Sequence, residues 1–345
     1  MRTRLVAVLT LALLGPGIGL ADSTWRRVIV DLRHLELLNT VEKKYTHGLC
    51  PGGYAFAVFE NNVARLLDAR TGKETQALSG HDGKIHDSAW TRDGRLVATS
   101  GFDTTVRVWE AGTGKTLLNV KPFGNFACSV AFSPDGKVVA AGSSNDGQLK
   151  LYDVSSGKAR EFQTLDTTLY AMEFSADGRF LAVNHTPMNR ADCSLRVYKV
   201  SDMSEQKLSI PGPVGGFGFS RDGRLLAYAD FNGAIAILET AGWTELRRMD
   251  AHQGGVSSIA FHPDGRYLAS CGHDGAAKIW DSETSSLVNT LPIKGQVDSR
   301  LAFGPDGASL IVATSDATVK LFGRRDTFRV AGKPAPAAPA PAPGK

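Results

Sequence analysis

Short runs of apolar residues, alternating with polar ones, recur along most of this chain and predict β-strands. Runs such as "YAFAVFE", "RLVATS" and "KVVAAGS" have the length and period of buried or half-buried strands. Most follow an Asp-Gly pair, which forms the tight turn of a β-hairpin because glycine accepts a positive φ. The pattern predicts an all-β chain built from hairpins.

The hairpin phrase occurs seven times at nearly constant spacing. Its turn residues are Gly52, Asp93, Asp135, Asp177, Asp222, Asp264 and Asp306, with successive spacings of 41, 42, 42, 45, 42 and 42 residues. Three positions before each turn stands a bulky residue: Leu49, Trp90, Phe132, Phe174, Phe219, Phe261 and Phe303. One bulky side chain at a fixed phase indicates a repeated core position, and four short strands per repeat are typical of a propeller blade.

A second marker confirms the phase of the repeat. An acidic or amide residue follows each turn, at Asn61, Asp103, Asp146, Asp192, Asn232, Asp274 and Asp316. Six residues later comes a large apolar or aromatic residue, at Leu67, Trp109, Tyr152, Tyr198, Leu238, Trp280 and Phe322. The offset survives the longer loop "HTPMNRAD" of the fourth unit. We therefore expect that insertion in a surface loop.

Two units carry residues by which the chain resembles the WD40-repeat family. They match its His-Ser-Asp-Trp set at His81, Ser100, Asp103 and Trp109, and again at His252, Ser270, Asp274 and Trp280. The resemblance covers roughly residues 28–330 and implies a closed, seven-bladed β-propeller with four antiparallel strands per blade. Such a tetrad provides hydrogen bonds for polar groups that the blade would otherwise bury without a partner. Blades without it are expected to rely on apolar packing.

Closure of the ring needs a strand from the opposite end of the chain, because an open blade would leave an unpaired edge. The N-terminal segment "WRRVIVDLRHLELL", Trp25 to Leu38, has the required β-forming character. We expect it to complete the last blade. The segment "TFRV", Thr327 to Val330, is the competing candidate.

The two ends of the chain predict an exported protein. Residues 1–21 combine a basic start, a short apolar run and small residues before Asp22, as in a signal peptide cleaved after Ala21. The propeller is expected over residues 22–331, and residues 332–345 form an Ala/Pro-rich tail that we expect to be disordered. The apolar run is too short to span a bilayer. The predicted location is the periplasm or the extracellular space, with no membrane span after cleavage.

Charge and cysteine usage narrow the chemistry further. The chain has 39 basic and 35 acidic residues, and removing Arg2 and Arg4 with the leader leaves 37 against 35, a near-neutral balance that argues against a nucleic-acid partner. The four cysteines lack zinc-ligand spacing: Cys50, Cys128, Cys193 and Cys271. Most lie in apolar strand patterns, as buried thiols do. The sequence does not decide whether Cys128 and Cys193 form a disulfide.

One stretch, "WEAGTGKTLL", resembles the end of a phosphate-binding loop. Trp109 stands where such a loop needs its first glycine, and "LDARTGKETQ" and "YDVSSGKARE" occupy the same slot in other units. Lys115 is therefore interpreted as a turn residue. No nucleophile elbow, zinc-protease or calcium-loop motif appears, and His47, His86 and His273 come from different units. We predict no enzyme activity, cofactor or metal.

The predicted function is a non-enzymatic, monomeric scaffold that binds protein partners on one face of the propeller. In the WD40 family the residue before the marker aspartate and the start of the innermost strand often contact partners. The resemblance implies as partner-binding residues Phe102, Phe231, His273, Lys84, Phe126 and Tyr170. The alternative is an exported propeller enzyme or small-ligand binder, hydrolase- or lactonase-like, with a site in the central channel. Its nearest residues by phase are His86, Asp87, Lys294 and Arg300.

Overall fold

A computed structural model gives the fold of this chain. The residues that it describes are Leu32, 35–41, 46–50, 53–144, 146–163, 167–186, 194–208, 210, 214–293, 300–304, 307–314 and 318–323. Contacts divide the chain into Met1–Val30 and Asp31–Lys345, and every described residue belongs to the second unit. The predicted leader at 1–21 and tail at 332–345 lie outside the described residues.

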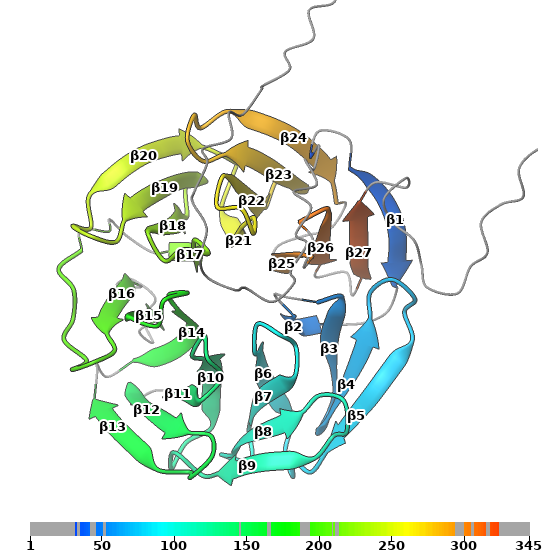
Figure 1. The fold of residues 1–345 in the computed structure, drawn as a ribbon, viewed down its shortest axis with the longest axis vertical. Coiled ribbons are helices and arrows are strands. Elements are labelled where there is room, and N and C mark those ends of the chain that lie inside the picture. Colours follow the sequence, from blue (N-terminus) through cyan, green and yellow to red (C-terminus); the bar gives the residue numbers. More distant parts are fainter. Residues whose placement is uncertain are drawn as a thin grey trace, which may run out of the picture. The chain divides into compact units, whose positions relative to one another are not determined.

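The described strands form seven small antiparallel sheets, the blades of a propeller (Figure 1). Blade 1 contains β2 (Thr46–Leu49), β3 (Ala55–Glu60), β4 (Val63–Asp68) and β5 (Glu74–Ser79). Blade 2 contains β6 (Ile85–Trp90), β7 (Leu96–Gly101), β8 (Val106–Glu110) and β9 (Thr116–Val120). Blade 3 contains β10 (Ala127–Phe132), β11 (Val138–Ser143), β12 (Gln148–Asp153) and β13 (Ala159–Gln163).

The second half of the ring repeats this order. Blade 4 contains β14 (Thr168–Phe174), β15 (Phe180–Thr186) and β16 (Ser194–Lys199). Blade 5 contains β17 (Val214–Phe219), β18 (Leu225–Asp230), β19 (Ala234–Glu239) and β20 (Glu245–Asp250). Blade 6 contains β21 (Val256–Phe261), β22 (Tyr267–Gly272), β23 (Ala276–Asp281) and β24 (Leu287–Pro292). Blade 7 contains β25 (Arg300–Phe303), β26 (Ser309–Thr314), β27 (Thr318–Gly323) and β1 (Glu36–Val41).

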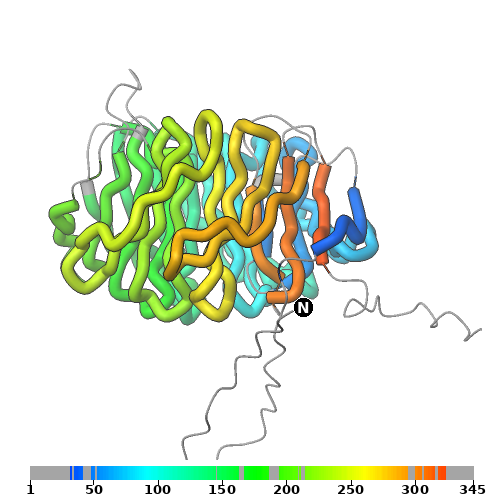
Figure 2. The backbone as a smooth tube through the Cα atoms, turned by 90° about the horizontal axis from the view of Figure 1, so that it is seen from above, coloured from blue at the N-terminus to red at the C-terminus, as the bar shows by residue number. Residues whose placement is uncertain are grey.

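The first strand of each blade surrounds the axis, and the strands run between two faces of the ring (Figures 1 and 2). We call the face on which the innermost strands begin the Phe102 face, because residues 102–105 connect β7 to β8 there. The opposite face, where residues 91–95 connect β6 to β7, is the Asp93 face. Because strands alternate in direction, β27 ends at Gly323 on the Asp93 face.

The predicted hairpins are confirmed, but the Asp-Gly pair is only the centre of each turn. In blade 2, Thr91 N donates to Leu96 O at 3.0 Å, so this pair extends the hairpin and residues 92–95 form its turn. Asp93 accepts hydrogen bonds from Thr91 Oγ1 at 2.7 Å and from Arg95 N at 3.0 Å. Gly94 follows with φ of 70°. Hydrogen bonds within the turn therefore occupy the Asp93 carboxylate.

The core lies between neighbouring blades. Val108 of blade 2 packs with Val130 and Val139 of blade 3 in one buried cluster. Across the closure, Phe56 of blade 1 packs with Ile311 of blade 7. Each blade thus buries its apolar faces against both neighbours, so the ring is stable only when closed.

The N-terminal strand closes the ring, as expected. β1 pairs antiparallel with β27, and Asn39 Nδ2 donates to Ala69 O at 3.0 Å and to Arg70 O at 3.1 Å, which ties blade 7 to blade 1. The strand is Glu36–Val41, so it shares Glu36 to Leu38 with the predicted segment, and Leu38 and Val41 pack on the core. Residues 25–31, 33 and 34 of that segment lie outside the described residues. The competing segment 327–330 lies outside the described residues.

Blade 4 departs from the four-strand pattern within the described residues. Its outer strand is reduced to a bridge between Tyr198 and Glu205, and Gln206 N donates to Val197 O at 2.7 Å. The predicted insertion falls in residues 187–193, which lie outside the described ranges. The stretch "WEAGTGKTLL" is the end of β8, a turn with Gly114 at φ of 72° and the start of β9. No helix follows it to receive a phosphate.

Candidate functional site

Blade 6 contains a chain of hydrogen bonds from its tryptophan to its aspartate. Trp280 Nε1 donates to Ser270 Oγ at 2.9 Å, and Ser270 Oγ lies 2.7 Å from His252 Nε2. His252 Nδ1 lies 2.8 Å from Asp274 Oδ1. Burial lowers the pKa of His252, and Asp274 offsets this effect only in part. The neutral His252 imidazole therefore links β22 and β23 to Asp274 in the turn between them.

Blade 2 contains the same chain of hydrogen bonds, but its hydroxyl belongs to Thr99. Trp109 Nε1 donates to Thr99 Oγ1 at 2.8 Å, and His81 Nε2 lies 2.8 Å from the same oxygen. His81 Nδ1 lies 2.9 Å from Asp103 Oδ2. The buried Ser100 Oγ has no hydrogen-bond partner among the described residues. The assignment of Ser100 to this tetrad is wrong.

The register of the hairpins explains the error. Trp109 pairs with Val97, as Trp280 pairs with Leu268, so the hydroxyl residue stands two positions further along the second strand. Neighbouring residues of a strand point to opposite faces, so Ser100 faces away from the imidazole. The hydroxyl lies ten residues before the tryptophan in both blades, and this offset was available in the sequence.

Other blades replace the tetrad with different polar contacts rather than with apolar packing alone. In blade 5, Tyr228 holds the register position of Thr99, and Arg248 Nη2 donates to its hydroxyl at 3.0 Å. In blade 4, Tyr198 Oη lies 3.1 Å from His185 Nε2. Burial lowers the pKa of His185 to about 3, so this histidine is neutral at physiological pH.

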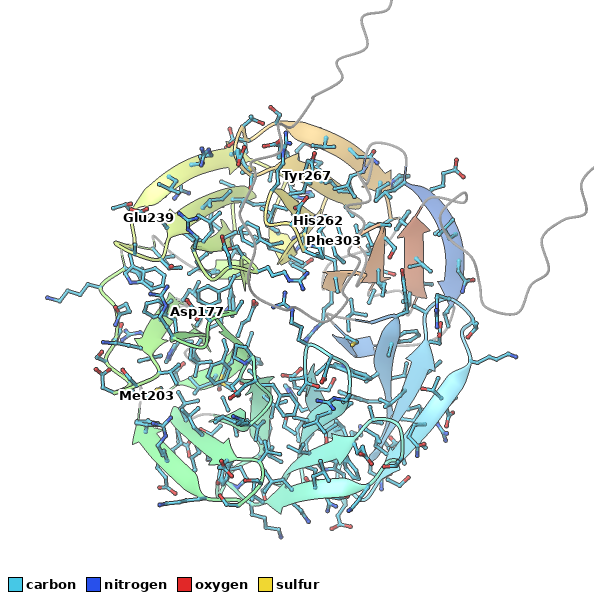
Figure 3. The ribbon with its side chains drawn as sticks, viewed as in Figure 1. Asp177, Met203, Glu239, His262, Tyr267 and Phe303 are labelled. Atoms are coloured by element: carbon cyan, nitrogen blue, oxygen red, sulfur yellow. The ribbon has the colours of Figure 1, made fainter. Side chains whose placement is uncertain are left out.

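A histidine on the Asp93 face joins blades 6 and 7. The His262 ring lies edge-on to Tyr267 and to Phe303, with centroids 5.8 Å and 4.9 Å away (Figure 3). His262 Nε2 also lies 3.0 Å from Gly307 O. This histidine replaces the serine of other turns and packs between blades.

The Phe102 face carries a cluster of three aromatic rings between blades 2 and 3. The Phe102 and Phe126 rings stack at 4.6 Å with an interplanar angle of 18°. His86 lies 5.7 Å from the Phe102 ring and 5.9 Å from the Phe126 ring. Phe102 is 51% exposed, although a phenylalanine is normally buried. We call Phe102, Phe126 and His86 the aromatic cluster.

Local backbone geometry presents the aromatic cluster. His86 occupies a β-bulge of β6 between Ile85 and Asp87, and its Nδ1 lies 2.7 Å from the backbone oxygen of Cys128 in blade 3. A bulge re-aims a side chain, which is how His86 reaches the next blade. Phe102 N donates to Lys84 O at 2.8 Å, which places the exposed Lys84 beside the cluster.

The other predicted partner-binding residues lie on the same face but apart from the aromatic cluster. Tyr170 of blade 4 is 47% exposed, and Phe231 of blade 5 is 56% exposed. His273 of blade 6 is also exposed and lies over Gly255. None of the ring contacts found in the described part of the chain joins these three residues to Phe102. Sequence reasoning missed His86 as a member of the cluster. The bulge recurs seven residues before the turn aspartate in blades 2, 3, 4 and 6, so the phase of the repeat could have indicated this position.

A family model described as "WD domain, G-beta repeat" matches residues 72–110, 121–153 and 243–281. The chain carries WD40 repeats. The first match contains the hydrogen-bonded tetrad of blade 2, and the third match contains that of blade 6. Each begins near the outer strand of one blade and ends with the third strand of the next. That offset explains why the last blade of this WD40 propeller needs an N-terminal strand.

Curated relatives share these repeats over part of their length. The chain is 35% identical to "Periodic tryptophan protein 2 homolog" of Schizosaccharomyces pombe, over 27% of this chain and 11% of that protein. It is 34% identical to "Periodic tryptophan protein 2" of Arabidopsis thaliana, over 26% of this chain and 10% of that protein. The chain is 26% identical to an uncharacterized WD repeat-containing protein of Synechocystis sp., over 37% of this chain and 38% of that protein. The chain spans about a tenth of the length of the first two relatives.

The axis of the WD40 propeller holds an ion pair between blades that are not neighbours. Arg300 Nη1 of blade 7 lies 3.5 Å from Asp87 Oδ1 of blade 2, and Val130 N donates to Asp87 at 3.3 Å. Burial raises the pKa of Asp87, and Arg300 opposes this rise. Of the four residues predicted for a site in the central channel, Asp87 and Arg300 contact each other. His86 belongs to the aromatic cluster instead, and Lys294 lies outside the described residues.

The described residues contain no group of three His, Cys, Asp or Glu side chains placed to hold a metal. Burial raises the pKa of Cys128 to about 12, so this thiol is unreactive. Cys128 is a free thiol, so it does not form the disulfide with Cys193 that the sequence left open. Cys193 itself lies outside the described residues. Within the described ranges no helix has the length and apolar character needed to cross a membrane.

Glu173 of blade 4 provides a pH-dependent prediction. The half-buried carboxylate accepts a hydrogen bond from Phe219 N at 3.0 Å, yet burial raises its pKa from 4.5 to about 7. The folded protein therefore binds this proton more tightly than the unfolded chain does, and stability falls as pH rises through this window. Glu173→Gln keeps the acceptor and removes the charge. We expect it to raise the free energy of unfolding by about 2 kcal/mol at pH 8.

The same substitution should have little effect at pH 4, where both states are largely protonated. Urea denaturation at the two pH values measures the difference. Glu283→Gln, at an exposed carboxylate of the turn after β23, is the control and should change stability by less than about 0.5 kcal/mol. Equal stabilisation by Glu173→Gln at both pH values would contradict the shifted pKa.

Proposed function

We propose that this WD40 propeller is a non-enzymatic scaffold that binds a protein partner on its Phe102 face. The observation that carries the proposal is the stack of the exposed Phe102 ring on the half-buried Phe126 ring. Aromatic side chains dominate the energetics of protein interfaces, and an exposed aromatic patch marks such sites. WD40 propellers generally bind proteins, which supports the same conclusion.

The surroundings of the aromatic cluster suit a protein interface. The stack supplies a flat apolar centre, while Lys84 and His86 supply polar groups at its margin. The backbone bond between Phe102 and Lys84 holds the turn in place, so little ordering is needed on binding. Tyr170 and Phe231, on the same face, extend the surface that a large partner would cover.

We also propose that the scaffold acts in the periplasm or the extracellular space as a monomer. The support is the leader-like composition of residues 1–21 and the near-neutral charge of the rest. The alternative of a small-ligand binder or enzyme has weaker support. The axial Asp87 and Arg300 neutralise one another instead of facing a substrate as free groups.

The test measures partner binding by variants of the aromatic cluster. The tagged protein is cross-linked in its native host, recovered from the exported fraction, and its partner identified and purified. Phe102→Ala should weaken binding of that partner about thirtyfold, and Phe126→Ala by a similar factor, because both rings would be buried in the interface. Binding is measured by calorimetry, and thermal melts verify that the variants remain folded.

Leu246→Ala is the matched control, since Leu246 is 44% exposed on the outer strand β20. It removes a similar exposed apolar side chain and should leave affinity unchanged. The proposal is wrong if Phe102→Ala and Phe126→Ala both bind the partner as the wild type does. Recovery of the chain with its leader still attached, in the cytosol, would separately refute export.

A further inference from the structure

Every blade except the fifth carries a basic residue at one position of its third strand. The position lies four residues after the acidic or amide marker of each unit. In chain order these residues are Arg65, Arg107, Lys150, Arg196, Ala236, Lys278 and Lys320. All six cations are half-buried. A charge that is partly removed from water needs a partner, because desolvation is costly unless a hydrogen bond or an opposite charge offsets it.

Five of the six cations have a partner within the chain, and in four blades that partner is a carboxylate. The four pairs are Arg65 Nε with Glu60 Oε2 at 2.5 Å, Lys150 Nζ with Glu161 Oε1 at 2.8 Å, Arg196 Nη1 with Glu205 Oε2 at 2.8 Å and Lys278 Nζ with Asp274 Oδ2 at 3.0 Å. Arg65 also pairs with Glu74, at 3.0 Å. In blade 7, Lys320 Nζ donates to the backbone oxygen of Ile293.

Arg107 of blade 2 is the exception. Neither a hydrogen bond nor an ion pair of its guanidinium group is found among the residues that the structure describes, and its buried Nε lacks a partner. Its Cζ lies 5.8 Å from the Trp109 ring centroid, and a Cβ built on Gly80 would lie 2.7 Å from its Nη1. Gly80 directly follows β5, which ends on the Phe102 face. These contacts hold the guanidinium group at that face.

The outer strand of blade 2 lacks the acidic residues that other blades use. Asn119 is paired with Arg107 across the strands, whereas Glu161 holds that place in blade 3. Thr116 holds the place that Glu74 has in blade 1. Both blade 2 residues are exposed and uncharged. The outer strand therefore leaves the arginine without a carboxylate.

The turn between β7 and β8 does not supply a carboxylate either. Phe102 stands before the marker where blade 1 has Glu60. The marker itself is engaged elsewhere, because Asp103 Oδ1 accepts from Thr105 Oγ1 at 2.8 Å and Asp103 Oδ2 lies 2.9 Å from His81 Nδ1. Blade 2 thus presents a half-buried cation whose usual partner is missing.

We infer that Arg107 binds an aspartate or glutamate side chain of the protein partner at the Phe102 face. A carboxylate is the group that the equivalent cation binds in blades 1, 3, 4 and 6. A guanidinium group offers paired N–H donors that match the two oxygens of a carboxylate. The inference rests on the proposed scaffold function and adds one chemical feature to the partner, an acidic residue near the segment that covers Phe102.

The first experiment supplies the missing carboxylate within the chain. Asn119→Glu places an acid opposite Arg107, as Glu161 stands opposite Lys150. It should raise the melting temperature by about 1 to 3 °C in the wild type and not at all in Arg107→Gln. Thermal melts of the four proteins measure this difference. No rise in the wild type, or an equal rise in both, overturns the inference.

The second experiment uses the partner that cross-linking recovers. Arg107→Gln should weaken its affinity about tenfold, because one charge-assisted contact is lost. Asn119→Glu should weaken it as well, since the added carboxylate then occupies the arginine. Arg65→Gln is the matched control: it removes the equivalent cation of blade 1, which is already paired, and should bind as the wild type does. Calorimetry measures the affinities, and thermal melts verify folding.

A third measurement reports the contact itself. In Arg107→Lys bound to the partner, a carbodiimide should couple the new amine to a carboxylate of the partner, and mass spectrometry identifies the amide. Arg65→Lys should instead couple to Glu60 or Glu74 of its own chain. Wild-type affinity of Arg107→Gln, with binding weakened by Phe102→Ala, overturns the inference and retains the scaffold. The converse result supports Arg107 and refutes the aromatic site.

Discussion

Replacing Thr99 by valine should lower the free energy of unfolding by about 3 kcal/mol, because it leaves two buried groups, Trp109 Nε1 and His81 Nε2, without a partner. Valine preserves the shape of threonine, so the loss measures the hydroxyl and not a cavity. Denaturant unfolding followed by tryptophan fluorescence gives the free energy.

Ser100→Ala is the matched control on the neighbouring residue. Its buried hydroxyl has no partner among the described residues, so its removal should leave stability unchanged or raise it by up to about 1 kcal/mol. Equal losses from Thr99→Val and Ser100→Ala would show that the hydrogen-bond chain of blade 2 does not run through Thr99.

Deletion of β1, residues 36–41, should cost on the order of 5 kcal/mol and make the protein prone to associate. The deletion removes Leu38 and Val41 from the core between blades 7 and 1 and breaks the bonds of Asn39 to Ala69 and Arg70. It also leaves β27 as an exposed edge with unpaired backbone groups. Unfolding experiments and size-exclusion chromatography measure the two effects.

Truncation of residues 324–345 is the corresponding control, since it removes the competing segment 327–330. Because β1 already occupies the edge of β27, we expect a change within about 0.5 kcal/mol. If this truncation destabilised the protein and deletion of β1 did not, the C-terminal segment would be the closing strand.

The blades were predictable because each is local in sequence. Asp93 and Gly94 lie within one hairpin, and the phase of Trp90 and Trp109 around that turn places both in the core. The error at Ser100 was also local. Two hydroxyl residues stand side by side in β7, and the choice between them depends on the alternation of the strand. The ten-residue offset to the tryptophan would have assigned Thr99.

Contacts between blades were less predictable. The sequence placed Phe102 and Phe126 on one face but did not show that their rings stack, since they belong to different blades. His86 joins them from a bulge that recurs in several blades, but its contact with Phe126 depends on how blades 2 and 3 pack together. The blade 5 contact of Tyr228 with Arg248 has no counterpart in the family pattern, so apolar packing was expected there instead.

By itself, the sequence determined the number of blades, the order of their strands and the two faces, because hairpins and their turns are encoded by residues a few positions apart. Only the tertiary structure decided which side chains of different blades meet. Asp87 pairs with Arg300, and Asn39 binds the turn of the first blade. Each of these contacts exists only because the ring closes, and closure depends on the summed curvature of all seven blades rather than on any one repeat.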